Sequence, residues 1–247
     1  MEPAAPLTEA SPTRILPIER AAAALEVLLC SGFPTQLVII TVLATFGMRP
    51  RALDGTFSAP FVFTLTLLDT ALLVSLVCFF LRAHRESVRD ALFGSRRIGR
   101  ELLLGLALIP ASFLVVICVL ALVQLVAPWL RNVAHNPLAD LAKTRGQAVL
   151  FAFVVMVAGG VREEIQRGFV LRRFEQFLGG GAAGLVVFSA IFGLGHIEQG
   201  YDVVLATATL GVFWGAITLR RRSVAAPLAA HAGFNLLQVV RFLVWGA

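Results

Sequence analysis

The sequence predicts an all-α membrane protein, a bundle of about seven to eight transmembrane helices. Three observations lead to this prediction. Of the 247 residues, 58% are hydrophobic and only 15% are charged, against about 25% charged in an ordinary soluble domain. Apolar runs of about 17–25 residues recur, which is the length that crosses a hydrocarbon core of about 30 Å. The basic residues lie mainly in short loops between these runs.

The N-terminal residues 1–19 contain several prolines and no apolar core, which predicts a disordered tail. The first apolar run follows directly and is too long for the hydrophobic region of a signal peptide. We interpret it as a retained membrane helix, so that residues 20–247 form a single transmembrane domain. Seven apolar segments can be drawn in this domain, and they cover residues 21–47, 57–81, 102–127, 146–178, 182–197, 202–219 and 224–245.

The distribution of charge predicts an orientation. The chain carries 21 Lys and Arg residues against 15 Asp and Glu residues. If the N-terminus is cytoplasmic, 13 basic residues fall in cytoplasmic loops and 5 in loops on the other side, as the positive-inside rule requires. We therefore predict a multi-pass integral protein of the cytoplasmic (plasma) membrane, in contact with membrane lipids. The sequence has no basic stripe with interleaved aromatic residues, so nucleic-acid binding is not expected.

Ionisable residues inside membrane segments are costly and are therefore candidates for function. The fourth segment carries Glu163, Glu164 and Arg167, and residues three and four apart are neighbours on a helix. An ion pair within the helix accounts for Arg167 and one glutamate, and Arg162 is a candidate partner for the other. Asp69 is the only aspartate deep in a segment, and we interpret it as a local hydrogen-bonding group.

Two later segments each carry a histidine four residues from a second candidate. Phe192 and His196 share one helical face, as do His231 and Asn235. With about 1.5 Å of rise per residue, Glu163, His196 and His231 lie roughly 14, 20 and 10 Å from the cytoplasmic ends of their segments. The last four helices can therefore bring these groups together. A glutamate and a histidine can activate water, and a second histidine with an asparagine can donate hydrogen bonds to an oxyanion.

Glu-Glu near Arg-Gly, then FxxxH, then HxxxN, on successive hydrophobic helices, resembles the CPBP family. That family comprises CAAX prenyl endopeptidases, bacteriocin-processing or immunity (Abi) proteins and their relatives, and the resemblance covers about residues 145–240. It implies a glutamate-dependent intramembrane endopeptidase in which His196 and a glutamate activate water. It also implies that His231 and Asn235 stabilise the oxyanion and that Arg167 orients the glutamates.

The spacing of the glutamates departs from the family pattern. Three residues usually separate the second glutamate from the arginine, whereas only two separate Glu164 from Arg167. If Arg167 and Gly168 set the register, Arg162 takes the place of the first glutamate and Glu163 that of the second. If the glutamates set the register, the helix must turn by about 100°, and a local distortion near residues 159–160 could absorb part of it. We predict Glu163 as the base, because it lies angularly nearer the usual position than Glu164.

The predicted function is hydrolysis of a peptide bond near the membrane, in a peptide or protein substrate that is lipidated or not. This mechanism requires no cofactor, although His196, His231 and Glu163 could together bind a divalent metal such as zinc. The irregular glutamate spacing motivates a first alternative, a non-catalytic bacteriocin-immunity or membrane binding protein on the same fold. A small proton-coupled transporter ranks lower, because the sequence has no internal repeat.

Overall fold

A computed structural model describes residues 15–245 of the chain, with side chains up to residue 241. Within that part of the chain every regular element is helical, which confirms the predicted all-α fold. The α-helices are α1 (Pro17–Leu29), α2 (Phe33–Thr45), α3 (Ala59–Ala83), α4 (Val88–Phe93), α5 (Ile98–Val126), α6 (Arg145–Val155), α7 (Glu163–Phe177), α8 (Gly181–Leu194), α9 (Tyr201–Arg221) and α10 (Ala225–Trp245). Three short 3-10 segments, η1 (Pro128–Leu130), η2 (Pro137–Ala142) and η4 (Ile197–Gln199), and one π-helix, η3 (Met156–Arg162), complete the description.

Three of these units are long and apolar enough to cross a membrane, namely α3, the α4–α5 unit over Val88–Val126, and α9. Helices α1 and α2 pass the same test together, as one span bent by 42°. The described residues thus agree with the predicted integral membrane protein, since lengths and composition of this kind suit a bilayer. The total of seven to eight spans stays a prediction.

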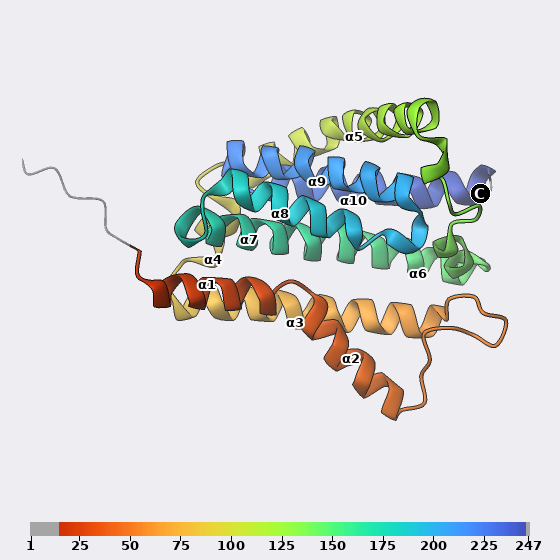
Figure 1. Cartoon of the computed structure of the whole chain (residues 1–247), viewed down its shortest axis with the longest axis horizontal. Helices are drawn as coiled ribbons and strands as arrows, with labels where there is room; N and C mark the ends of the chain where they lie inside the picture. Colours follow the sequence, from red (N-terminus) through yellow and green to blue (C-terminus); the bar gives the residue numbers. More distant parts are fainter. Residues whose placement is uncertain (1–14, 246–247) are drawn as a thin grey trace, which may run out of the picture.

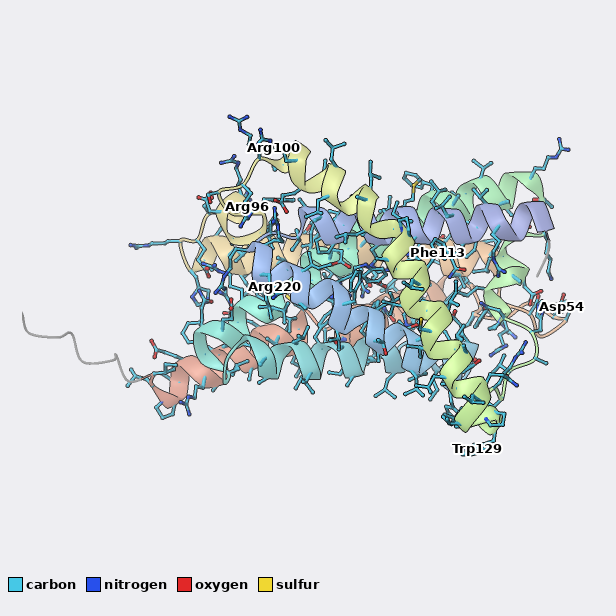
Figure 2. All side chains as sticks on the ribbon, turned by 90° about the horizontal axis from the view of Figure 1, so that it is seen from above. Asp54, Arg96, Arg100, Phe113, Trp129 and Arg220 are labelled. Carbon is cyan, nitrogen blue, oxygen red and sulfur yellow. The ribbon has the colours of Figure 1, made fainter. Side chains whose placement is uncertain are left out.

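Most of the helices run along one long axis, with α6 and α7 end to end in the middle (Figure 1), whereas α5, which carries Phe113, crosses them obliquely (Figure 2). Helix α5 lies at one edge of the bundle and α1–α3 at the other, where α2 diverges from α3 (Figure 1). Helix α10 packs against α5, η3 and α6, and α9 packs against α8 and α5. The main apolar core therefore forms around α7 and α10, and its members include Leu73, Phe169, Phe192, Trp214 and Phe234.

The first apolar segment, predicted as one helix over residues 21–47, is broken into α1 and α2. Gly32 has a φ of 90°, in the left-handed region that glycine adopts without steric cost. Pro34 follows in the first turn of α2, where its missing N–H would have no helical partner. The carbonyl of Cys30, at the break, accepts a hydrogen bond of 2.8 Å from Gln166 Nε2. A side-chain hydrogen bond from α7 therefore stabilises the break.

The predicted tail falls mostly outside the described residues, which begin at residue 15. Its last residues are helical, because α1 begins at Pro17, so the boundary predicted at residue 19 is too late. Proline suits the first turn of a helix, and Glu19 accepts a hydrogen bond of 2.7 Å from the Leu16 N–H. These two local features explain the early start.

A network of charged residues joins α1, the α3–α4 link and α7 at one end of the bundle. Glu26 contacts His84 Nε2 and Arg173 Nε, each at 2.6 Å. Glu86 accepts hydrogen bonds from both Arg172 and Arg173. Burial raises the pKa of Glu86, but these two arginines outweigh it and hold the pKa below its usual value. The network therefore stabilises the contact between α1 and α7 through ionised groups.

Figure 2 labels side chains at the two ends of the bundle. Arg96, Arg100 and Arg220 lie near one end, and Asp54 and Trp129 lie towards the other (Figure 2). The three arginines belong to loops or helix ends that the sequence assigns to the cytoplasmic side. Their grouping is what a membrane protein with a basic cytoplasmic face requires.

Candidate active site

The site begins at the π-helix η3, which lies between α6 and α7 in one continuous helical run. Gly159 and Gly160 belong to η3 and are buried. A Cβ atom on Gly159 would lie 2.1 Å from Asn235 Nδ2, and one on Gly160 would lie 2.4 Å from the Ala232 Cβ. The two glycines therefore allow α10 to approach η3 closely. The local distortion expected near residues 159–160 is present, and π-bulges of this kind are frequent at functional sites.

The two adjacent glutamates that begin α7 have different surroundings. Glu164 is fully buried, and its Oε1 accepts a hydrogen bond from Arg167 Nη1 and lies 2.8 Å from His231 Nδ1. The Glu163 side chain is 20% exposed, and its Oε2 lies 3.7 Å from His231 Nε2. The ion pair expected within the helix thus joins Arg167 to Glu164. Glu163 is the accessible carboxylate of the two.

Three aromatic rings surround the buried guanidinium of Arg167. Its Cζ atom lies 5.2 Å from the ring centre of Phe188, 5.0 Å from that of Phe192 and 5.7 Å from that of Trp214. Ring faces attract a cation, more strongly when water is excluded. Arg167 Nε and Nη2 have no hydrogen-bond partner among the described residues. The aromatic rings therefore stabilise the part of the charge that Glu164 does not reach.

His231 lies between the two glutamates and is fixed by its surroundings. One ring nitrogen faces Glu164 and the other faces Glu163. The Trp214 ring stacks on the imidazole, with centroids 3.9 Å apart and planes at 23°. One turn further along α10, Asn235 donates a hydrogen bond of 3.5 Å from Nδ2 to the Val155 carbonyl. The structure therefore places Asn235, His231 and both glutamates around η3.

His196 lies just beyond the end of α8 and contacts the site through Phe192. Its Nδ1 lies 2.9 Å from the Phe192 carbonyl oxygen. The Phe192 ring lies edge-on to both histidines, with centroids 5.2 Å from His196 and 5.9 Å from His231. Among the described residues His196 forms no hydrogen bond or ion pair with either glutamate. Phe192 therefore separates the two histidines that the sequence places together.

Within residues 15–245, no three His, Cys, Asp or Glu side chains are grouped so that they could hold a metal ion. The suggested set of His196, His231 and Glu163 is thus not brought together as a ligand cluster.

These side chains lie in a single stretch of the chain, from α6 to α10. Residues 145–237 match the family model of Rce1-like type II CAAX prenyl endopeptidases. The predicted resemblance to the CAAX protease family is confirmed over this segment. No curated protein and no solved structure matches the chain. The Rce1-like segment contains every predicted site residue, which are Glu163, Glu164, Arg167, Phe192, His196, His231 and Asn235.

Some residues that contact the site were not predicted as parts of it, among them Phe188, Trp214 and Asp69. Trp214 of α9 belongs to the Rce1-like segment and touches both Arg167 and His231. Asp69 of α3 lies outside that segment and forms an ion pair of 2.7 Å with Arg162. The signal for Asp69 was its position deep in an apolar segment. Trp214 gave no such signal, because an aromatic residue in an apolar helix is ordinary core.

Proposed function

We propose that this protein is a CAAX-type intramembrane endopeptidase, which hydrolyses a peptide bond of a peptide or prenylated protein near the membrane. The observation that carries the proposal is the position of His231 between Glu163 and Glu164 in the Rce1-like segment. Its bundle of seven to eight spans would place the catalytic groups on the last four helices. The substrate class comes from the family match.

In the proposed reaction Glu163, with His196 moving close, removes a proton from water as the oxygen attacks the peptide carbonyl carbon. The carbonyl oxygen becomes an oxyanion, and Asn235 Nδ2 donates a hydrogen bond to it. His231 donates a second one from Nε2, which requires the doubly protonated ring, since its Nδ1 proton faces the Glu164 carboxylate. The C–N bond then breaks, and Glu163 returns the proton to the leaving amine. The products are one carboxylate and one amine, and no metal or cofactor takes part.

Glu164 has a supporting role in this mechanism. Its carboxylate is fully buried and is held by Arg167, so it has no route to a water molecule from outside. It orients His231 through the 2.8 Å contact to Nδ1. A histidine ring held on one nitrogen presents the other in a fixed direction. Phe192 and Trp214 keep Arg167, and thereby Glu164, in place.

The test is cleavage of a quenched peptide library and of prenylated peptides by the purified, detergent-solubilised protein. Glu163→Gln should abolish cleavage and leave thermal unfolding unchanged, because the replaced carboxylate is not fully buried. The matched control is Glu198→Gln in the same segment, whose carboxylate is 65% exposed and pairs with Arg51; it should cleave like the parent. Cleavage should also survive a metal chelator.

Other outcomes would change the assignment in defined ways. Loss of cleavage in Glu164→Gln with full activity in Glu163→Gln would exchange the roles of the glutamates. Sensitivity to the chelator would indicate a metal. A parent protein that cleaves none of these peptides would favour a binding or immunity function. In that case Arg162, which directly precedes the glutamates and pairs with Asp69, would serve the structure of the site and not a reaction.

A further inference from the structure

Arg162 ends η3 directly before the two glutamates and has an acidic side chain on either side. Its Nη2 lies 2.7 Å from Asp69 Oδ2, and its Nη1 lies 3.9 Å from Glu163 Oε1. The Arg162 side chain is 12% exposed and that of Asp69 is 3% exposed. Buried charges of this kind are tolerated only when they are paired. Asp69 is thus the nearer and better partner of Arg162.

Asp69 is held by residues of the first turn of α2, directly after the break between α1 and α2. Thr35 Oγ1 donates a hydrogen bond to Asp69 Oδ1, and Gln36 Nε2 donates one of 3.3 Å to Oδ2. Gly32 makes room for the guanidinium, because a Cβ atom there would lie 2.3 Å from Arg162 Nη2. The residues that surround the Arg162 guanidinium therefore come from α2, the turn before it, and α3, all outside the Rce1-like segment.

The contacts around Arg162 continue through the proposed catalytic groups. These contacts form a series of ionisable side chains, in which each lies within 4.0 Å of the next. In order, the series is Asp69, Arg162, Glu163, His231, Glu164 and Arg167. Acidic and basic side chains alternate along it. If Asp69 were neutral, the nearest anion for Arg162 would be Glu163. An ion pair between these two would draw the Glu163 carboxylate away from His231.

We infer that Asp69 is a positioning residue for the reaction, which acts by holding Arg162 away from Glu163. The Glu163 carboxylate then stays directed at His231 and free to accept a proton. This inference rests on the proposed function, since it assumes that Glu163 is the base. It also explains how the chain accommodates an arginine directly before its two glutamates: the guanidinium is retained by α3.

The experiment compares kcat and KM of the full-length parent, Asp69→Asn, and Asp69→Asn combined with Arg162→Gln. In the single variant Arg162 turns to Glu163, and kcat should fall by about 10- to 100-fold, as expected for a misplacement of about 1 Å. KM should not change, because Asp69 is only 2% exposed and a substrate at the surface would not reach it. In the double variant the unpaired cation is gone, so kcat should recover by about tenfold over Asp69→Asn.

Two control variants, Asp54→Asn and Thr41→Val, and one further test variant, Thr35→Val, accompany these variants. Asp54→Asn replaces an exposed aspartate that pairs with Lys143 at the surface, and it should behave like the parent. Thr35→Val removes a hydrogen bond to Asp69 without changing any charge, and it keeps the inference testable if Asp69→Asn does not fold. We expect kcat to fall several-fold in Thr35→Val and to stay unchanged in Thr41→Val, whose hydroxyl donates to the Leu37 carbonyl of its own helix.

The outcomes separate this inference from the proposed function. A parental kcat in Asp69→Asn, or a double variant no more active than the single one, would overturn the inference while Glu163→Gln remains inactive. A kcat unaltered in Thr35→Val would do the same. If Glu163→Gln keeps full activity, or the parent does not cleave, the proposed function itself fails and the role of Asp69 fails with it.

Discussion

Replacing Gly159 by alanine should inactivate the protein without unfolding it. The added Cβ atom would lie 2.1 Å from Asn235 Nδ2 and 3.4 Å from His231 Nε2. Asn235 Nδ2 is the end of a side chain that can rotate, so the clash is relieved by moving the amide and not the backbone. The expected loss therefore falls on the proposed oxyanion site.

The size of the effect follows from this distance. The amide must retreat from 2.1 Å to the 3.4 Å at which ordinary contact begins, a movement of about 1.3 Å. A misplacement of about 1 Å in a catalytic group costs about 100-fold in rate, or about 2.7 kcal/mol of barrier. Alanine also favours a helix over glycine by about 1 kcal/mol, which offsets the cost of rearrangement, so the midpoint of thermal unfolding should change little.

The assay measures kcat on the peptide that the parent cleaves best, together with thermal unfolding in detergent. Gly146→Ala is the matched control, because Gly146 lies in the same helical run and a Cβ atom there meets nothing within 4 Å. We expect parental kcat for Gly146→Ala and a loss of about 100-fold for Gly159→Ala. Parental activity in Gly159→Ala would refute the assignment of Asn235 to the oxyanion.

Three further changes test the packing and the charges. Gly160→Ala should lower the stability by about 1–3 kcal/mol, because the added atom would lie 2.4 Å from the Ala232 Cβ and 3.0 Å from its Cα, which cannot rotate away; unchanged thermal unfolding would contradict this packing. Arg167→Met leaves the carboxylate of Glu164 buried without its cation and should cost about 3–5 kcal/mol, visible as a large fall in the unfolding temperature. The pKa of Glu86 is held below its usual value, so its contribution to stability is complete above the unfolded-state pKa and is lost as the pH falls through the lower folded pKa. Glu86→Gln should therefore be less stable than the parent at pH 7, and the difference should vanish at acidic pH; a constant difference would argue against the ionised network.

The helices were predictable from the sequence because apolar runs of sufficient length form helices in a membrane whatever surrounds them. The limits of α3, α9 and α10 lie within a few residues of the predicted segments. The break at Gly32 was not predicted, since glycine and proline also occur inside unbroken membrane helices. Its decisive contact, from Gln166 to the Cys30 carbonyl, joins residues 136 positions apart, and a local pattern does not contain such information.

The pairing of the glutamates was open for a related reason. Arg167 is four residues from Glu163 and three from Glu164, and both spacings permit an ion pair on a helix. The choice depends on which face of α7 meets α10, and η3 determines that face. In a π-helix the hydrogen bonds join residues five apart, so the direction of each following side chain differs from that in a continuous α-helix. The glycines indicated where a distortion could occur but not its direction.

The expected approach of His196 to the glutamates failed on a different point. The depth predicted for His196 came from the rise along a helix that continued through residue 197. The structure ends α8 at Leu194, and His196 Nδ1 is occupied by the Phe192 carbonyl at 2.9 Å. Catalytic hydrogen bonds are often long or unformed before substrate binds. A role for His196 in activating water therefore requires movement of the η4 segment, whereas Glu163 and His231 already face each other.

The unequal distances from His231 to the two glutamates support different roles for them in the proposed reaction. At 2.8 Å, Glu164 is within hydrogen-bond range of Nδ1. Its side chain is fully buried next to Arg167 and the aromatic rings that surround Arg167. At 3.7 Å, Glu163 is too far from Nε2 for a direct hydrogen bond, so the Glu163 carboxylate keeps its lone pairs available to another donor. A base must be both close to its partners and free to accept a proton, and these distances support the proposal that Glu163 is the base. Asp69 maintains the second condition by retaining Arg162, the one cation of the described residues that is within 4.0 Å of Glu163 besides the histidine.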